Sequence, residues 1–511
     1  MIRNFKWLLI ASVTLAACSS DDDGSNAVVD EPITSGSADF SKYVALGDSF
    51  AAGYSDNALF RKGQENSYPN ILASQFALAG GGEFLQPYMV DNIGGFSMGG
   101  VQIPQFPTRL YLGLPNPEVP SPSPMNVSGV SGTVFGTTVT GPFNNFGVPG
   151  AKSFHLTFAG YGQLNPYFGR FASSPTASVL GDALAQNPTF FSLWIGGNDV
   201  LGYATNGGVP TSQDPVAGND ITPPATFDAV YSGMVAQLAQ NGRKGVVANL
   251  PYINTLPFFT TVPFNPLTTT VLGSGDVAVG EATVDALNSQ LYGPLKQALT
   301  AFGAGDRIEL LSKTQGNPLL IKDESLTDLS AQLTAAFTPT LGVATATFYG
   351  QIFGQARQAK GGTNRDLILL TTRAAIGTAP AGIPAPLNKF GITYPLQDKH
   401  VLVPAEIAEI AVATDAYNVT IANAAQTHGL AFVDTFAIMN QLLNGGIRFG
   451  NYQITATFAT GGAFSLDGIH PSARGYALIA NKFAEAINAT YGSNFKGVDL
   501  GNYQIQYPSN L

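Results

Sequence analysis

Short apolar runs alternate with segments of helical spacing along most of the chain. The clearest helical segment lies near the end, where Tyr476, Ile479, Ala480, Phe483 and Ile487 recur at i, i+3, i+4, i+7 and i+11. Runs of strand length alternating with helices predict βαβ units, and hence a mostly parallel sheet covered by helices on both faces. The predicted strands are residues 43–46, 190–195, 245–250, 307–311 and 430–434.

Two long stretches interrupt this alternation. Residues 79–144 are rich in Gly, Pro and Ser, which predicts surface excursions. Residues 260–400 exceed what a small α/β core needs, and 329–356 contain no charged residue. A cap or lid over a site would explain this second insertion, and so would an extension of the core. The aromatic residues of 329–356 could line an acyl pocket, although buried core at helical spacing is the more common explanation.

The charge balance excludes one class of partner. The 511 residues include 24 Lys and Arg against 34 Asp and Glu, a formal net charge of -10, which argues against nucleic-acid binding because phosphate recognition needs a basic face. Hydrophobic residues make up 45% of the chain, enough for a large core. The chain has one cysteine, so neither an intramolecular disulfide nor a thiolate metal cluster can form.

The N-terminus has the pattern of a secretory signal. Arg3 and Lys6 precede a short apolar run, and small residues stand directly before Cys18. The sequence Leu-Ala-Ala-Cys resembles the lipobox of bacterial lipoproteins, which implies cleavage after residue 17 and lipidation of Cys18. An ordinary signal peptide with a coincidental cysteine is the alternative. The resemblance implies a membrane partner through the lipid anchor and a place in the bacterial cell envelope, at the outer membrane.

Residues 18–41 are polar and acidic without periodicity, which predicts a flexible tether. An acidic run after a lipidated cysteine resembles export signals of surface-exposed lipoproteins in some bacteria. A solvated linker explains the same residues equally well. The predicted organisation is therefore a signal peptide (1–17), the tether (18–41), a catalytic domain with insertions at about 79–144 and 260–400 (42–500), and a tail (501–511).

Two motifs offer the parts of a nucleophilic site. Ser49 follows Gly47-Asp48 at the carboxyl end of the first predicted strand, where parallel sheets present their ligands. The second motif, Asp467-Gly468-Ile469-His470-Pro471, precedes the last helix. A serine hydroxyl needs a base, and the base needs a carboxylate to fix its tautomer, so a three-residue spacing lets Asp467 serve His470. A Gly-Asp-Ser helix cap and a structural turn are the alternatives.

Two further motifs could stabilise an oxyanion. Asn198 follows the predicted strand 190–195, and its amide can donate a hydrogen bond to developing negative charge. The segment 145–151 contains Gly147 and Gly150, where a missing side chain lets backbone N–H groups approach a substrate. Taken alone, the first is also explained by an Asx turn and the second by a loop.

Together and in this order, the four motifs resemble the SGNH or GDSL hydrolase family. The resemblance implies Ser49 as nucleophile, Asp467 and His470 as the rest of the triad, and Gly150 and Asn198 as oxyanion donors beside the Ser49 N–H. It also implies a three-layer α/β/α sandwich, flavodoxin-like, around a mostly parallel five-stranded sheet, here with large insertions. Its catalysis needs neither metal nor organic cofactor, and the ester substrate would be a lipid or an acylated carbohydrate.

Three departures from the family pattern affect this interpretation. Phe50 stands where the family name has Leu, the long excursion before Gly150 leaves Gly147 as a rival oxyanion donor, and the 260–400 insertion puts any substrate preference in doubt. Four histidines, of which His470 alone follows such an aspartate, argue against a histidine zinc site. An acyltransferase or carbohydrate deacetylase on the same triad remains open, as does a non-catalytic surface binding protein. The sequence leaves the oligomeric state open.

Overall fold

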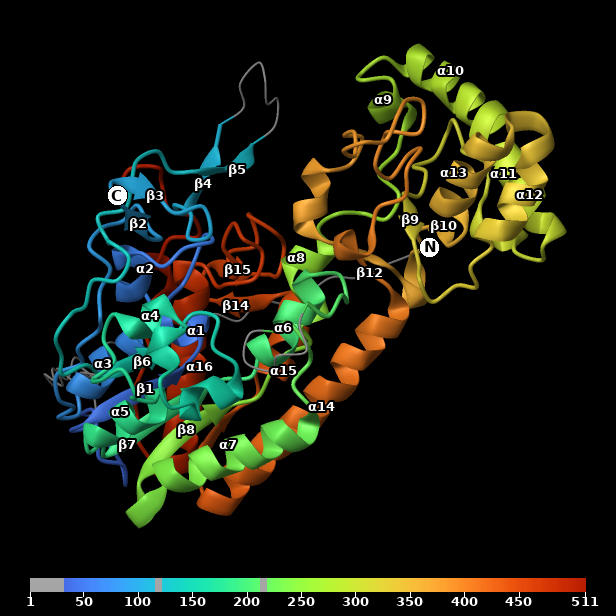
Figure 1. Cartoon of the computed structure of the whole chain (residues 1–511). Helices are drawn as coiled ribbons and strands as arrows, with labels where there is room; N and C mark the ends of the chain where they lie inside the picture. Colours follow the sequence, from blue (N-terminus) through green and yellow to red (C-terminus); the bar gives the residue numbers. More distant parts are fainter. Residues whose placement is uncertain (1–31, 115–121, 212–217) are drawn as a thin grey trace, which may run out of the picture.

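The computed structural model describes residues 32–114, 122–211 and 218–511, so Cys18 and the predicted signal peptide lie outside the described residues. The protein is a mixed α/β protein with one central sheet of five parallel strands in the order β13-β8-β7-β1-β6 (Figure 1). The strands are β1 (Tyr43–Gly47), β6 (Asn145–Gly147), β7 (Phe190–Trp194), β8 (Lys244–Ala248) and β13 (Ala431–Val433).

Four of these strands coincide with predicted apolar runs. Every residue of β1 and β7 is buried, as expected for central strands of a parallel sheet that is covered on both faces. The predicted strand at 307–311 is wrong: the segment runs from a short 3-10 turn into irregular chain, and Ile308 and Leu311 are buried in a cluster of the second insertion. Conversely, β6 was not predicted because three residues are too few to show a period.

The long helices pack on the sheet in two groups. α16 (Ala473–Tyr491) contacts α3 (Tyr68–Ala77), β8 and β13, whereas α14 (Pro404–His428) contacts α7 (Pro224–Leu238), β8 and β13. The predicted apolar face of the last helix is confirmed: Tyr476, Ala480, Phe483 and Ile487 are buried, and Ile479 is half-buried. The remaining helices of the main body are α1 (Ser49–Ala52), α2 (Arg61–Glu65), α4 (Pro166–Gly169), α5 (Val179–Ala185), α6 (Asn198–Thr205), α8 (Pro257–Thr260) and α15 (Thr435–Leu443).

The strand order fixes where a site can form. When the five strands are renumbered 1 to 5 in chain order, their spatial order is 2-1-3-4-5. The direction of winding therefore reverses between the first and third strands, β1 and β7. In open parallel sheets, ligands bind at the carboxyl ends of the strands beside this switch point. Ser49 begins the helix after β1, and Asn198 begins the helix after β7. The fold therefore brings the two motifs to the same place although 149 positions separate them in sequence.

The first insertion is largely irregular chain. Within residues 79–144 the structure describes two short hairpins. Arg109, almost fully buried, joins this excursion to the C-terminal tail by donating hydrogen bonds to the carbonyls of Pro508 and Ser509. The hairpin strands are β2 (Ser97–Met98) with β3 (Val101–Gln102), and β4 (Leu110–Gly113) with β5 (Ser123–Asn126).

Residues 260–400, called the insertion lobe below, stand beside the main body at the N-terminal end of α14 (Figure 1). The uncharged stretch forms an antiparallel pair of helices within the lobe, and Tyr349 packs between Phe337 and Phe353 in the lobe's own apolar cluster. These aromatic residues therefore belong to a core and not to a pocket. The lobe's helices are α9 (Thr269–Leu272), α10 (Val277–Leu287), α11 (Gly293–Ala301), α12 (Ser330–Leu341) and α13 (Val343–Phe353).

Short antiparallel pairs complete the described chain. One lies within the insertion lobe, one joins the lobe to the segment before α14, and one follows α15. They are β9 (Leu320–Lys322) with β10 (Ala356–Gln358), β11 (Leu367–Ile368) with β12 (Val401–Leu402), and β14 (Ile447–Phe449) with β15 (Tyr452–Ile454). No helix of the described ranges is long and apolar enough to span a bilayer.

Candidate active site

Ser49, His470 and Asp467 form one hydrogen-bonded chain at the carboxyl edge of the sheet. His470 Nε2 lies 2.9 Å from Ser49 Oγ, and His470 Nδ1 lies 2.9 Å from Asp467 Oδ2. A carboxylate accepts only, so Nδ1 carries the proton and Nε2 is left to accept one from the serine. The rings of Tyr54 and Phe50 lie 4.6 and 5.4 Å from the imidazole and hold it in place.

The turn around Asp467 keeps this carboxyl ionised. Its Oδ1 accepts the backbone N–H groups of Ile469 and His470, and its Oδ2 accepts the N–H of Asn57 as well as the imidazole. Burial by itself raises the pKa of Asp467, but the neighbouring His470 and these backbone donors outweigh it, so the pKa lies below its ordinary value. The spacing of three residues places Asp467 and His470 on one tight turn, so the Asp467 carboxylate can accept both the backbone N–H and the imidazole N–H of His470.

Ser49 is held by the strand-to-helix turn in which it lies. It is the first residue of α1, and Asp48 caps that helix by accepting the N–H of Phe50 at 3.0 Å. Both Asp48 and Ser49 are buried. Burial raises the pKa of Asp48 to about 7, against the opposing effect of the Phe50 N–H and His470. The nucleophile candidate therefore sits on a short, capped turn beside the sheet and not on a free loop.

The segment that carries Gly150 contacts both Asn198 and the strand that ends at this turn. Gly150 has φ +80°, a conformation that favours glycine; a side chain built on it would meet open space, and its N–H has no acceptor in the described part of the chain. Asn198 Nδ2 donates to the Ala151 carbonyl at 3.0 Å, which fixes the amide and leaves its second hydrogen available. The rival, Gly147, is occupied: it lies in β6 and donates its N–H to Asn145 Oδ1 at 2.9 Å.

A buried aspartate joins these two donor segments. Asp199 accepts both the N–H and the hydroxyl of Ser153, at 2.8 and 2.7 Å, and thereby ties the start of α6 to the chain that follows Gly150. Burial raises the pKa of Asp199 to about 6 in spite of these donors. Sequence reasoning missed this residue. The Asn-Asp pair at the start of a helix was the available signal, but its partner lies 46 positions away in sequence.

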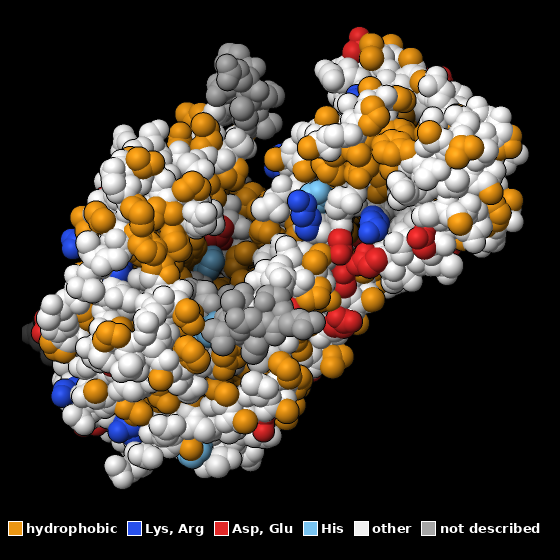
Figure 2. Space-filling view, in the orientation of Figure 1, with side chains coloured by type: hydrophobic (Ala, Val, Ile, Leu, Met, Phe, Trp, Pro, Cys, Tyr) orange, Lys and Arg blue, Asp and Glu red, His pale blue; other side chains and the backbone are white. Residues whose placement is uncertain are grey.

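The insertion lobe contributes to the walls around the triad. Phe258, just before the lobe, donates its N–H to the Gly468 carbonyl at 2.9 Å, and a side chain on Gly468 would meet Phe258 and Leu370. A hollow lined by Asp467, Leu370 and Arg373, among others, lies on this side of the triad. Figure 2 shows the deep hollow between the main body and the lobe, with hydrophobic side chains along its edges.

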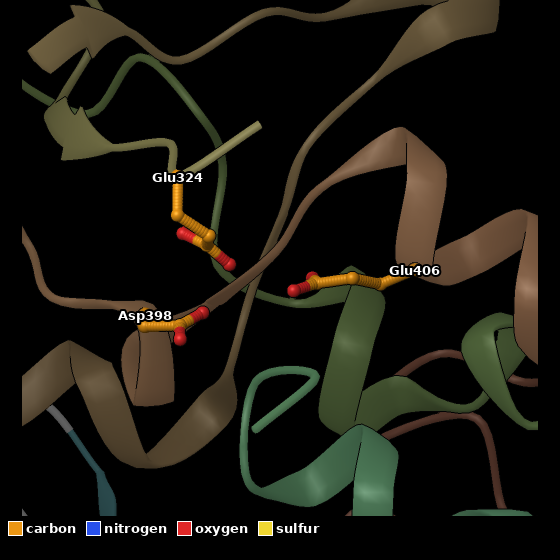
Figure 3. Close-up of side chains that lie close together, drawn as sticks. All are labelled: Glu324, Asp398 and Glu406. Carbon is orange, nitrogen blue, oxygen red and sulfur yellow. The ribbon is translucent and has the colours of Figure 1, made fainter. Parts of the chain in front are cut away.

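Three acidic side chains meet where the insertion lobe joins α14, a cluster that sequence reasoning did not predict. Oxygen atoms of Glu324, Asp398 and Glu406 all lie within 4.8 Å of one another (Figure 3). Burial raises the pKa of Asp398 to about 7 and that of Glu406 to about 8, so these two carboxyls keep their protons up to a higher pH than exposed carboxyls do. It lies outside the triad and its surroundings, and we assign it no role in the chemistry.

Comparisons with known proteins add little to this geometry. No family model and no curated protein matches the chain. A gut microbial diltiazem-metabolizing enzyme of known structure is similar at 11% identity, with a TM-score of 0.16. The match covers 73% of this chain and 64% of that enzyme, less than two thirds of its length. A likeness this weak decides neither fold nor function, so both rest on the chain's own residues.

Proposed function

We propose that the protein is a serine ester hydrolase of the SGNH or GDSL type, which cleaves carboxylic esters through an acyl-enzyme on Ser49. The observation that carries the proposal is the hydrogen-bonded chain from Ser49 through His470 to Asp467. Nucleophile and base within hydrogen-bond reach, with the base oriented by a third group, is the general signature of covalent acyl transfer. The donors of Gly150 and Asn198 beside it support the same reaction.

The cycle follows from the positions of these groups. His470 Nε2 takes the Ser49 proton as Oγ attacks the ester carbonyl, and Asp467 stabilises the imidazolium that forms. The N–H groups of Ser49 and Gly150 and the amide of Asn198 donate to the carbonyl oxygen as it becomes an oxyanion. His470 then returns the proton to the leaving alcohol. Water, deprotonated by the same imidazole, attacks the acyl-enzyme; His470 then returns this proton to Ser49 Oγ as the acid leaves.

The proposal extends to the place of the enzyme in the cell. The lipobox-like sequence before Cys18 supports a lipid-anchored protein of the bacterial envelope. Several acyl chains on one residue would hold it stably, where one chain alone would be marginal. Its substrate would then be an ester in or near the membrane, carried by a lipid or by an acylated carbohydrate.

Hydrolysis of p-nitrophenyl esters by the full-length protein tests the proposal. We expect turnover that Ser49→Ala lowers by at least about 10³. The matched control is Ser289→Ala, which removes an exposed hydroxyl of the insertion lobe and should leave turnover unchanged. Equal inactivity of wild type and Ser49→Ala in folded samples would contradict a hydrolase. Products that shift from acid to a new ester as an alcohol acceptor is titrated in would identify an acyltransferase instead.

A further inference from the structure

A semi-enclosed apolar pocket opens beside the triad. Its lining includes both neighbours of Ser49, the residue before Asn198 and both neighbours of His470, so three of the four motifs border it. These bordering residues are Asp48, Phe50, Gly197, Ile469 and Pro471. The cavity has a volume of about 90 Å³ and is open to solvent at its mouth.

The pocket continues from the triad between two helices of the main body. α15 and α16 each line it with one face, in which the lining residues recur at i, i+3, i+4 and i+7. Seven residues of helix advance about 10 Å. The lining residues are Thr435, Ile438, Met439 and Leu442 of α15, and Gly475, Leu478, Ile479 and Lys482 of α16.

The walls are almost entirely apolar. Among the described lining residues, the charged ones are Asp48 at the triad end and Lys482 at the other, where Lys482 Nζ donates to Glu485 at 2.7 Å. The hydroxyl groups of a sugar would find few partners between these helices, and burying a hydroxyl without a hydrogen-bond partner is unfavourable. A hydrocarbon chain loses nothing there, and its burial is favourable.

We propose that this pocket binds the acyl chain of the substrate, a chain of about eight to ten carbons. The length follows from the helix faces, since an extended chain advances about 1.2 Å per bond and the faces span about 10 Å. The acyl group stays on Ser49 after the alcohol has left. A pocket that binds the acyl chain keeps it in place while water replaces the alcohol beside His470. This inference rests on the proposed function and names its substrate class.

The insertion lobe plays no part in this pocket. None of the pocket's described lining residues belongs to 260–400. Chain-length preference is therefore set by the main body, and we expect it to follow substitutions in α15 and α16.

Two ester series on the full-length protein test the assignment. In methyl esters of lengthening acids, kcat/KM should rise about fourfold for each added methylene up to about eight to ten carbons and then level off, which is the factor expected for full burial of one CH₂. In acetate esters of lengthening alcohols, kcat/KM should change little. A rise that follows the alcohol series, or a flat acid series with Ser49-dependent acetate hydrolysis, would overturn the pocket assignment while leaving the hydrolase intact.

Two positions on α15, Ile438 and Leu443, provide a matched pair of variants. Ile438→Trp adds bulk inside the pocket at a partly exposed position, whereas Leu443→Trp adds the same side chain to the 41%-exposed Leu443 outside it. The ratio of decanoate to acetate kcat/KM should fall at least about tenfold in Ile438→Trp, the loss of roughly two buried methylenes. It should be unchanged in Leu443→Trp. If Ile438→Trp does not fold, Ile479→Trp fills the same space from α16 and should give the same result.

A binding measurement separates the pocket from the chemistry. Decanoate should bind to the Ser49→Ala variant in calorimetry, and the added Ile438→Trp should abolish binding. Binding of decanoate by a protein that hydrolyses no ester would support the pocket and contradict the proposed function. Ester hydrolysis without decanoate binding, or equal binding to both variants, would contradict the pocket.

Discussion

Replacing Asp467 by Asn tests the proposed chemistry at one atom. In the wild type both carboxylate oxygens accept: Oδ1 from two backbone N–H groups, and Oδ2 from the N–H of Asn57 and from His470 Nδ1. An amide has one accepting end. If its oxygen keeps the two backbone donors on Oδ1, its NH₂ group faces His470 and Asn57; in the other orientation it faces both backbone donors.

The first orientation has the lower free energy. The imidazole can accept a hydrogen bond from the new NH₂ group by changing tautomer, whereas a backbone N–H can only donate. His470 would then carry its proton on Nε2 and could not accept one from Ser49. We expect kcat/KM in Asp467→Asn to fall by about 10³–10⁴, the loss caused by a wrong tautomer in serine proteases and about 4–5.5 kcal/mol in the barrier. The N–H of the exposed Asn57 would lose its acceptor, which should lower the free energy of unfolding by about 0.5–1.5 kcal/mol, the net contribution of one hydrogen bond.

The assay is ester hydrolysis together with urea unfolding. The matched control is Asp276→Asn, since Asp276 caps α10 by accepting two backbone N–H groups and Asn caps equally well. Both quantities should stay near wild type in this control. Activity of folded Asp467→Asn within tenfold of wild type would refute the tautomer argument, and unaltered stability would refute the account of Asn57.

Three further predictions concern other parts of the molecule. Asn198→Ala should lower kcat by about 10²–10³ with little change in KM, because it removes one oxyanion donor; an effect on KM alone would contradict that role. In Glu406 burial raises the pKa from 4.5 to about 8, so the folded protein keeps a proton that the unfolded chain releases, and stability should fall as pH rises through this window. Thermal unfolding should show a smaller fall in Glu406→Gln than in wild type or in the exposed control Glu281→Gln, and equal falls would count against the assignment. Arg357→Ala should lower the free energy of unfolding by about 3–5 kcal/mol, because it leaves two buried carboxylates of the insertion lobe without their cation; exposed Arg365→Ala should cost little, and similar denaturation midpoints for the two variants would refute the argument.

The sequence did not predict the burial of Asp56 either. Unlike Asp199, Asp56 carries no local signal of burial. Asp56 is almost fully buried beside the Asp467 turn, where its Oδ1 accepts the N–H of Leu466 at 2.8 Å and burial raises its pKa to about 7. It lies just after the Ser49 motif, in a turn with positive φ, and nothing in its own neighbours in sequence marks it as buried. The contact that buries it comes from 410 positions further along the chain.

The sequence by itself determined four of the five strands of the central sheet and the order of the chemical groups. Apolar runs at β1, β7, β8 and β13 are long enough to show their burial, and a parallel sheet gathers the residues at the carboxyl ends of its strands along one edge. The nearness of Ser49 to Asn198 and the reach of Asp467 to His470 were therefore predictable from local pattern. Local pattern could decide no more than this, because it reports whether a residue is buried but not against which partner.

Only the tertiary structure decided the rest. The strand β6 is too short to show a period, the run at 307–311 finds its burial in the insertion lobe instead of the sheet, and the aromatic residues of 329–356 fill that lobe's core. The pocket between α15 and α16 and the acid cluster around Glu406 join residues far apart in the chain. Such features depend on how finished elements pack against each other, and packing depends on shapes and distances that a one-dimensional pattern does not contain.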